Sequence, residues 1–416
     1  MSRSISCLHL ADIHFGMETH GFTNPQTGLN TRLEDFRDSL SQAIDYAIEH
    51  ELDLAVFAGD AYKRNNPNPT EQRELVAQFA RLADAGIPTV MISGNHDIPV
   101  MQGKAASIDI FRSIQPGMFH VFVNEATQEP RVIETRKGPI AVCAFPYISP
   151  SHLRSLPPFQ KKQGDEFIAE YERFFHETLH NMLQQIPQDI PRLLAAHITV
   201  RGASFGGYRG VGNMIDDIQI HPAELAEAGF DYVALGHIHR HQNLTTNTAV
   251  PVVYPGSIDR VDFSEAGETK GFVVAEIRRG GATYSFLPLD VRPMVHVEVA
   301  AEEDVPITDC LIDAIECERI DGAIVKVTFV ADEEEMRDLD MKRVHQALQS
   351  AHFKVGLQRI PKNEGMRKRN ASLSTEVSVQ EALNAYIREH GELKADAPAL
   401  MAKAREIEKS VQKMDS

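Results

Sequence analysis

The sequence predicts an α/β fold with a polar site at the carboxyl ends of its strands. Two observations in the N-terminal part of the chain predict it. Apolar runs of strand length alternate with amphipathic helical segments, in the order strand, helix, strand, helix, strand. Each strand is followed directly by polar residues of types that bind metal ions. Right-handed crossovers bring such strand ends to one edge of an open α/β sheet, where binding sites form.

The first strand is expected at residues 5–10 and leads into Asp12 and His14. Side chains alternate along a strand, so residues two positions apart point to the same side. This spacing suits two ligands of one ion, although an Asp that caps the next turn beside a surface His would give the same pattern. Residues 33–49 follow with apolar side chains at helical spacing, which predicts an amphipathic helix.

The second strand is expected at residues 52–58, a continuous apolar run of the kind found in central parallel strands that are covered on both faces. It leads into Asp60, which is either a second carboxylate of the site or a cap for the next helix. That helix is expected at residues 69–85, with Thr70 as its N-cap.

The third strand, residues 90–92, runs into the sequence Ser-Gly-Asn-His-Asp. Gly94 allows the backbone to turn where a side chain would clash. Asn95, His96 and Asp97 then place an amide, an imidazole and a carboxylate side by side at a strand end. This arrangement is costly unless a charged group sits there. A metal ion would supply that charge, and an ordinary polar turn is the alternative.

Three short strands, expected to be antiparallel, follow at residues 119–122, 131–135 and 140–145. Four more strands are then expected, at residues 193–196, 232–235, 252–254 and 271–277. A long helix is expected at residues 166–185. His197 follows the strand at 193–196, and His237 and His239 follow the strand at 232–235. Two histidines in the pattern HxH at a strand end form a moderately specific pair of metal ligands.

The composition limits the classes of protein to which the chain can belong. Its 416 residues allow two or three domains, and its net charge of −17 argues against a generally basic surface that coats nucleic acid. No apolar run approaches the ~20 residues of a membrane span, and the four cysteines show no zinc-type spacing. We therefore expect a soluble, cytoplasmic protein with reduced cysteines.

The polar residues at the strand ends form one set: Asp12, His14, Asp60, Asn95, His96, His197, His237 and His239. Each is weakly informative alone, but their recurrence after consecutive strands predicts a site for two divalent ions that share one carboxylate. Oxygen and nitrogen ligands without a thiolate favour manganese, iron or zinc over copper. Two such ions about 3.5–4 Å apart suit displacement at phosphorus, because they activate a water and neutralise phosphate charge.

The order of these motifs, DxH, GD, GNHD, a lone His and GHxH, resembles the signature of the calcineurin-like metallophosphoesterases over residues 5–277. The segment at residues 254–272, YPGSIDRVDFSEAGETKGF, is similar to one branch of that family, the SbcD-type DNA repair nucleases. The resemblance implies a sandwich of two mixed sheets flanked by helices. It also implies a nuclease that hydrolyses DNA phosphodiesters by attack of a metal-bridging hydroxide, in double-strand-break repair with an SbcC-like ATPase.

The resemblance further implies a role for each site residue. The first metal ion would be held by Asp12, His14, Asp60 and His239, and the second by Asp60, Asn95, His197 and His237. Mn²⁺ is the ion expected first, with Fe²⁺, Zn²⁺ and Mg²⁺ as alternatives. His96 would be catalytic, facing the scissile phosphate and helping the leaving oxygen to depart. Asp97 would orient or polarise a neighbouring histidine.

The chain is expected to contain a nuclease domain at 1–290, a small α+β domain at 291–361 and a tail at 362–416. The resemblance implies that the α+β domain is a capping domain that shapes DNA access, and a dimerisation or purely stabilising module is the alternative. The tail begins with a basic run that would either contact phosphates or form a solvated linker: Lys362, Arg367, Lys368 and Arg369. Helices are expected at 378–389 and 398–414. The resemblance implies that they bind the coiled coil of an SbcC-like ATPase, and the alternative is that they fold back on their own domain.

Two other functions stay open at this point. The first is a phosphodiesterase or phosphatase that acts on small nucleotides or phosphoproteins, and the second is a metal-loaded scaffold without catalysis. The complete set of ligand residues argues against a scaffold, and the expected capping domain and tail argue against a small substrate. DNA, an SbcC-like ATPase and a second copy of the chain are the expected partners. Any dependence on ATP must come from the partner, because the chain has no Walker motif.

Overall fold

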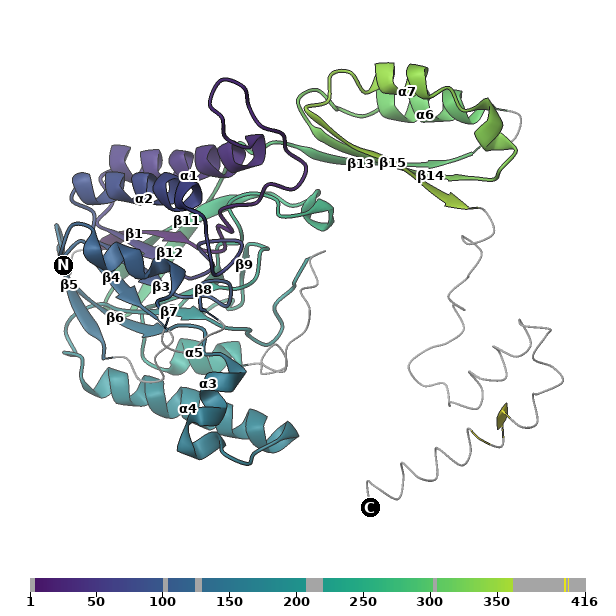
Figure 1. Cartoon of the computed structure of the whole chain (residues 1–416). Helices are drawn as coiled ribbons and strands as arrows, with labels where there is room; N and C mark the ends of the chain where they lie inside the picture. The colour runs from purple at the N-terminus through teal and green to yellow at the C-terminus, as the bar shows by residue number, and fades with distance from the viewer. Residues whose placement is uncertain are drawn as a thin grey trace. The chain divides into compact units, whose positions relative to one another are not determined.

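The structure, a computed structural model, describes residues 4–99, 104–123, 129–206, 220–301, 305–361, 400–401 and 403. The chain divides into two compact units. The larger comprises the described residues of Met1–Val297, Ile315–Val327 and His345–Gly356, and the smaller those of Glu298–Ala314, Thr328–Val344 and Leu357–Ser416. Figure 1 shows the strands of the larger unit between helices on two sides.

The first sheet of the larger unit contains six strands in the order β12-β11-β1-β2-β3-β4. They are β1 (Ile5–Leu10), β2 (Leu54–Phe57), β3 (Thr89–Ile92), β4 (Phe119–Phe122), β11 (Gly271–Arg278) and β12 (Gly281–Pro288). Strands β1 to β4 run parallel to one another, β11 is antiparallel to β1, and β12 is antiparallel to β11. The parallel part carries the first three polar motifs at its carboxyl edge.

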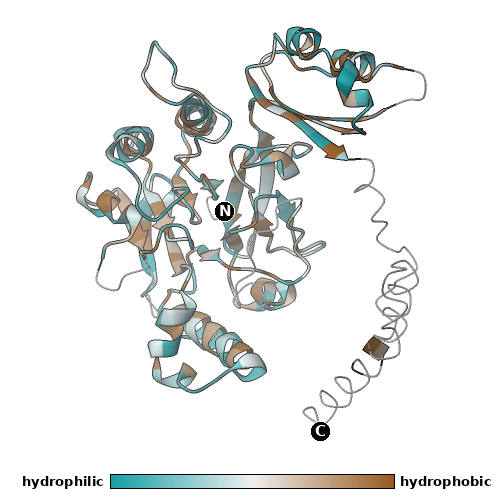
Figure 2. Ribbon diagram, turned by 45° about the vertical axis from the view of Figure 1, so that its right-hand side comes forward, coloured by the Kyte–Doolittle hydropathy of each residue, from teal (hydrophilic) through white to brown (hydrophobic). Residues whose placement is uncertain are grey.

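Two crossover helices, α1 (Thr31–Glu49) and α2 (Pro69–Asp84), cover the outer face of this sheet (Figure 1). Apolar side chains of these helices, such as Phe36 and Phe79, pack with Phe57 of β2 in one buried cluster. Figure 2 shows hydrophobic and hydrophilic residues alternating along the helices, as amphipathic helices require. The helical periodicity of the sequence is thereby accounted for by packing against the sheet.

The predicted N-cap of α2, Thr70, is wrong by two residues. The cap is Asn68, whose side-chain oxygen accepts the backbone N–H groups of Thr70 and Glu71 at 2.9 and 3.0 Å. The Glu71 carboxylate accepts the Asn68 N–H in return at 2.9 Å. This capping box satisfies donors on both sides of the helix start, which a single Thr70 hydroxyl cannot do.

The second sheet also has six strands, in the order β5-β6-β7-β8-β10-β9. They are β5 (Arg131–Thr135), β6 (Gly138–Phe145), β7 (Arg192–His197), β8 (Tyr232–Gly236), β9 (Gln242–Asn243) and β10 (Val252–Tyr254). Helix α4 (Gly164–Gln184) covers its outer face, and the shorter helices α3 (Pro150–Ser155) and α5 (Pro222–Glu227) lie on the same side (Figure 1).

The expected antiparallel arrangement of the first three strands after residue 97 is wrong for β4 and correct for the pair of β5 and β6, although β6 also has a parallel neighbour. Strand β4 belongs to the first sheet and is parallel to β3, and β6 is parallel to β7. Strand β5 is antiparallel, to β6. The tight connection between β5 and β6 permits only an antiparallel pair, whereas the longer connections elsewhere leave direction to the packing of the whole sheet.

The two sheets pack face to face around a shared apolar core, which confirms the predicted sandwich. Cys7, Val56 and Ile92 enter this core from the first sheet, and Val142 and Ala195 enter it from the second. Because both sheets contribute parallel strands, the carboxyl ends of strands from both sheets come to the same edge. The position of the site therefore follows from the packing of the two sheets.

A third sheet has the order β13-β14-β15, formed by β13 (Met294–Ala300), β14 (Ile324–Ala331) and β15 (Phe353–Pro361). With α6 (Ile307–Glu316) and α7 (Met341–Ala347) it gives the predicted small α+β arrangement, which fits a capping domain. The domain boundaries proposed from the sequence stay predictions. The expected helices at 378–389 and 398–414 lie outside the described residues, apart from 400, 401 and 403. Among the described helices, none combines the length with the apolar composition that a membrane-spanning helix needs.

Candidate metal centre

The strand ends of both sheets meet at one edge of the sandwich. Motifs after β1, β2 and β3 reach this edge from the first sheet, and motifs at the ends of β7 and β8 reach it from the second. All of the predicted strand-end residues lie here, each in contact with at least one other: Asp12, His14, Asp60, Asn95, His96, His197, His237 and His239. The structure therefore assembles the set that the sequence indicated.

The loops that carry these residues hold the backbone in the left-handed region that non-glycine residues rarely adopt. The φ angle is 51° at Asp12, 48° at His14, 59° at Asp60 and 101° at His237. Hydrogen bonds from the Asp12 N–H to the Gly59 oxygen (2.9 Å) and from the His14 N–H to the Asp60 oxygen (3.0 Å) tie the first two loops together. Strained residues that cluster in this way are typical of functional sites.

Glycines are required where the loops approach one another. A Cβ atom at Gly94 would overlap the Asp60 carboxylate, and a Cβ atom at Gly59 would overlap the ring of His197. Gly59 also has a φ angle of 98°. The turn predicted at Gly94 is present, and its physical reason is close packing against a loop far away in the sequence.

Asp12, His14 and His239 form the first group whose ligand atoms converge, within 4.8 Å of one another. Nε2 of His14 lies 2.9 Å from Nε2 of His239. Two neutral imidazole nitrogens at this distance can share one proton, whereas a cation would accept a lone pair from each. Burial, followed by His239, lowers the pKa of His14 well below its usual value, which favours the neutral form that binds metal. This group fits a divalent ion.

Asp60 lies between the histidines of the two sheets. Its Oδ2 is 3.8 Å from Nε2 of His14 and 3.5 Å from Nε2 of His197. The ligand atoms of Asp12, Asp60 and His197 also lie within 4.8 Å of one another. Burial alone would raise the pKa of Asp60, but the charges of the surrounding histidines, His197 first, hold it far below the usual range. A carboxylate at this point is suited to binding two ions at once.

Asn95, His197 and His237 form the second group. Nδ1 of His197 lies 2.8 Å from the carbonyl oxygen of Ala58, an acceptor that directs Nε2 into the site. The side-chain oxygen of Asn95 is 3.1 Å from that Nε2 and 3.2 Å from Nδ1 of His237. Burial would lower the pKa of His197, but the Asp60 carboxylate raises it to about 9. The Asp60 carboxylate thus favours positive charge beside it, which is what a bound divalent ion would provide.

His96 lies beside these groups with its side chain half-buried. Its ring packs edge-on against that of His14, with 4.8 Å between the ring centroids. Its Nδ1 is 2.9 Å from the carbonyl oxygen of Lys63, and its backbone N–H donates to Asp60 at 2.8 Å. Since the Lys63 carbonyl can only accept a hydrogen bond, it holds Nδ1 as the donor and leaves Nε2 outside this contact.

Asp97 makes contacts different from those predicted. Its carboxylate accepts the N–H groups of Asp60, Ala61 and Gly94 at 2.9 to 3.0 Å and the Ser107 hydroxyl at 3.0 Å. No hydrogen bond joins Asp97 to a histidine in the part of the chain that the structure describes. Its oxygens are used instead to connect the loops after β2 and β3. Asp97 therefore positions the loop of Asp60, and it is too deeply buried to touch a substrate.

The structure adds two residues that the sequence motifs did not identify, Glu265 and Lys270. Glu265 ends the short helix η3 (Phe263–Glu265), and its Oε1 lies 2.7 Å from Nδ1 of His239. Lys270 is paired with the other carboxylate oxygen of Glu265 at 2.8 Å. The one signal in the sequence was the similarity of the segment at 254–272 to SbcD-type nucleases. That similarity does not indicate that residue 265 contacts residue 239. The predicted DNA contacts Lys362, Arg367, Lys368 and Arg369 lie outside the described residues.

The profile of the calcineurin-like phosphoesterase family matches residues 5–241, a range that includes every strand-end residue from Asp12 to His239. An uncharacterized metallophosphoesterase, YhaO, of Bacillus subtilis (strain 168) is 26% identical over 288 residues, which are 69% of this chain and 60% of that protein. The D subunit of nuclease SbcCD of the same strain is 28% identical over 285 residues, 66% of this chain and 66% of that protein. The chain thus covers less than two thirds of the length of either relative.

Two solved structures show a weaker likeness. A dimetal phosphatase from Danio rerio covers 67% of this chain and 98% of its own, with 11% identity and a TM-score of 0.37. The protein TT1561 of Thermus thermophilus covers 68% of this chain and 99% of its own, with 13% identity and a TM-score of 0.36. At these TM-scores neither supports an argument about activity.

Proposed function

Since the chain belongs to the calcineurin-like phosphoesterase family, we propose that it is a two-metal DNA nuclease subunit that acts in double-strand-break repair with an SbcC-like ATPase. Family membership itself makes the chain a metal-dependent hydrolase of phosphoesters. The step from phosphoesters in general to DNA is the proposal. It is supported by the 28% identical relative, which is named as the D subunit of nuclease SbcCD, and by the similarity of the segment at 254–272.

The observation that carries the proposal is the convergence of the whole proposed ligand set, with His96 beside it. The proposed ligands are Asp12, His14, Asp60 and His239 for one ion and Asp60, Asn95, His197 and His237 for the other. A scaffold without catalysis would not need a half-buried imidazole whose Nε2 stays outside the contact with the Lys63 carbonyl. The arrangement therefore favours hydrolysis over a purely structural use of metal.

Each residue has a part in the proposed chemistry. Asp12, His14, Asp60 and His239 would hold one divalent ion and Asp60, Asn95, His197 and His237 a second, which we propose to be Mn²⁺. When bound, the ions would activate a water and stabilise the negative charge that develops on the phosphate oxygens. His96 presents Nε2 to the leaving 3′ oxygen and acts as a general acid or an electrostatic stabiliser. Lys63 adds positive charge, since its ammonium is near enough to contribute to the lowered pKa of His14. Positive charge near the centre favours a phosphate anion.

The proposed partners rest on the tail of the chain and on resemblance. We propose that Lys362, Arg367, Lys368 and Arg369 contact DNA phosphates and that the segments at 378–389 and 398–414 bind an SbcC-like coiled-coil ATPase. The name of the 28% identical relative, a subunit of nuclease SbcCD, supports a partner for the present chain as well. A homodimer is the third proposed association.

The test is nuclease activity of the purified full chain on a linear duplex and on a hairpin, with Mn²⁺ added and with or without an SbcC-like ATPase. The variant His96→Ser is compared with the wild type and with His180→Ser, which replaces an exposed histidine of α4. We expect His96→Ser to lose on the order of 10²–10⁴-fold in rate, the usual contribution of a general acid, while binding Mn²⁺ like the wild type. His180→Ser should cut DNA normally.

The alternative function is tested in the same assay with small phosphodiesters and nucleotides as substrates. Rapid hydrolysis of those compounds, with no cutting of any DNA with or without the ATPase, would reject the nuclease proposal in favour of a small-molecule phosphodiesterase or phosphatase. Equal DNA cutting by His96→Ser and wild type would reject the role proposed for His96 while leaving the nuclease proposal in place.

A further inference from the structure

The segment between β10 and β11, residues 255–270, lies within the stretch that is similar to SbcD-type nucleases. None of its residues belongs to the proposed ligand set. We propose that this segment is a clamp for the metal centre, in which Glu265 positions His239 and Lys270 holds Glu265. The inference rests on the proposed metal site, because it concerns one of its ligands. It assigns Glu265 as a positioning residue that acts through His239, with no contact to the substrate.

The contact between Glu265 and His239 is short and fully buried. Oε1 of Glu265 lies 2.7 Å from Nδ1 of His239, and the carboxylate belongs to a residue with 0% relative exposure. A buried carboxylate is costly unless it is paired and hydrogen-bonded. Here the other oxygen, Oε2, accepts the N–H of Val261 at 3.0 Å and is 2.8 Å from Nζ of Lys270. The carboxylate is therefore held on both oxygens.

Lys270 fixes the clamp from the other side. Its side chain is 1% exposed, and its ammonium pairs with Glu265 and with Glu268, at 2.8 Å in each case. The ammonium also donates a hydrogen bond to the backbone oxygen of His239 at 3.1 Å. The segment thus holds both the ring and the backbone of His239. Lys270 thus stabilises the position of Glu265 and His239, a role that the sequence around it does not indicate.

The clamp determines which nitrogen of His239 faces the metal centre. A carboxylate accepts a hydrogen bond from the N–H at Nδ1, which keeps the proton on that nitrogen and leaves Nε2 unprotonated. This arrangement is found behind many metal-binding histidines. Nε2 of His239 is the atom that lies 2.9 Å from Nε2 of His14, inside the first group. The second group is held differently, because His197 is oriented by the carbonyl of Ala58. Loss of Glu265 should therefore weaken one ion and spare the other.

The experiment titrates the metal-free full chain with Mn²⁺ by calorimetry, with no DNA present. Wild type should bind two ions, and Glu265→Gln should bind one ion normally and the other about 10–100-fold more weakly, as is usual when the partner of a ligating histidine is lost. Glu268→Gln is the matched control, because Glu268 pairs with the same lysine, whereas the acceptor for Nδ1 of His239 is Glu265. It should bind both ions like the wild type.

Two further measurements separate positioning from folding. Glu265→Gln leaves the Lys270 ammonium with a weakened partner, and the double variant Glu265→Gln/Lys270→Met removes that ammonium. The double variant should therefore have a higher thermal stability than Glu265→Gln. It should still bind one ion more weakly than the wild type. Nitrogen NMR of the metal-free chain should show His239 protonated at Nδ1 in the wild type and redistributed in Glu265→Gln. Unchanged binding of both ions by Glu265→Gln, or equal weakening of both, overturns the proposal. Wild type that binds two ions but cuts no DNA would reject the nuclease proposal and leave the clamp standing.

Discussion

Single residues at the edge of the sandwich are linked to loops that lie far away in the sequence. Asp97 is the clearest case, because one buried carboxylate accepts three backbone N–H groups from two loops. Burial, and then the nearby charge of Asp60, raises the pKa of Asp97 to about 7. The residue is thus held by its hydrogen bonds in spite of an unfavourable environment for its charge. Its contribution is to keep Asp60 in its left-handed conformation.

Replacement of Asp97 by alanine should therefore destabilise the fold. The change leaves the N–H groups of Asp60, Ala61 and Gly94 without an acceptor, and each buried unpaired donor costs about 1–3 kcal/mol. We expect Asp97→Ala to lower the free energy of unfolding by on the order of 3 kcal/mol, measured by urea denaturation in metal-free buffer. Asp189→Ala, at an exposed position, should change it by less than about 0.5 kcal/mol. Equal stability of the two variants would contradict the role given to Asp97.

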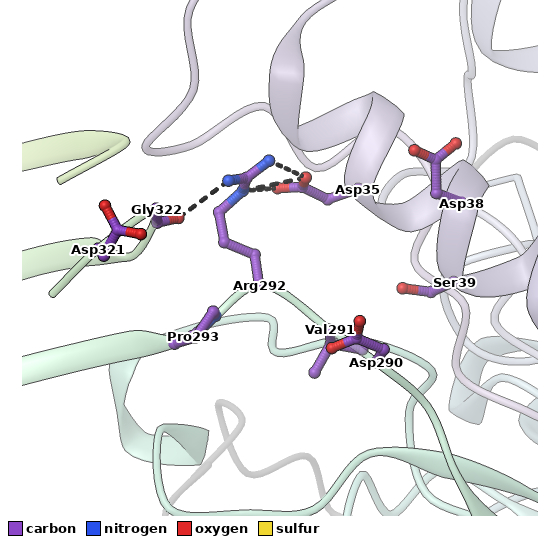
Figure 3. A pocket seen from close by; sticks show the side chains of 9 residues that line it. All are labelled: Asp35, Asp38, Ser39, Asp290, Val291, Arg292, Pro293, Asp321 and Gly322. Carbon is purple, nitrogen blue, oxygen red and sulfur yellow. Dashed lines mark hydrogen bonds and ion pairs between the residues drawn. The ribbon is translucent and has the colours of Figure 1, made fainter. Parts of the chain in front are cut away.

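At the level of elements, Asp35 of helix α1 forms an ion pair with Arg292, in the segment that precedes β13. Figure 3 shows the Arg292 guanidinium between the Asp35 carboxylate and the carbonyl of Gly322. Nη2 of Arg292 is 2.7 Å from Asp35, and Nη1 of the buried Arg32 is 2.8 Å from the same carboxylate. These groups border a pocket of about 330 Å³ that is lined by Asp35, Asp38, Ser39, Asp290, Val291, Arg292, Pro293, Asp321 and Gly322.

Asp35 should therefore matter more for stability than its neighbours on α1. Breaking a buried ion pair by removing one partner costs about 3–5 kcal/mol, because the other charge is left uncompensated. Arg292 is partly exposed and Arg32 keeps Asp259 at 3.5 Å, so we expect a loss of about 2–3 kcal/mol for Asp35→Asn. Asp38→Asn is the control, since its side chain is 65% exposed and lines the same pocket. Chemical denaturation that ranked Asp38→Asn as the more damaging change would contradict this account.

Over the whole molecule, charge and activity are expected to be divided between residues 1–361 and the tail at 362–416. The chain has a net charge of −17, which opposes binding to DNA by the molecule as a whole. The basic run at Lys362 to Arg369 is the local exception in the sequence. The metal centre is built entirely from the larger unit, in residues that precede β9. Hydrolysis of a small phosphodiester should therefore not depend on the tail.

Removal of residues 362–416 tests this division. The shortened chain should hydrolyse small phosphodiesters with Mn²⁺ at the rate of the full chain, because every proposed ligand is retained. It should fail to bind an SbcC-like ATPase in a pull-down and should bind DNA more weakly, with a smaller dependence of affinity on salt. Replacement of Lys362, Arg367, Lys368 and Arg369 by glutamine in the full chain isolates the basic run. Unaltered binding of ATPase and DNA by the shortened chain would reject the proposed role of the tail.

The family resemblance of the motifs predicted the sandwich of two sheets. The order of the elements, the α/β class and the polar residues at the strand ends could be predicted from the residue pattern directly. These features follow from patterns that act over a few positions: apolar runs, helical spacing, and polar residues placed directly after strands. Asp12 and His14, for example, were indicated by their spacing, because the alternation of side chains along a strand is a local property, and they gained weight from similar motifs after the other strands. The chain order of the five motifs then indicated one site.

Contacts between residues that are distant in the sequence became known from the tertiary structure. The contact of Glu265 with His239, the use of Asp97 to hold the Asp60 loop, and the parallel direction of β4 were not predicted. In each case the partners belong to different loops or strands, and their distance is set by how the two sheets and their connections pack. Local propensity does not predict such packing. The free energy that favours one packing arrangement over another is distributed among many buried groups across the whole fold.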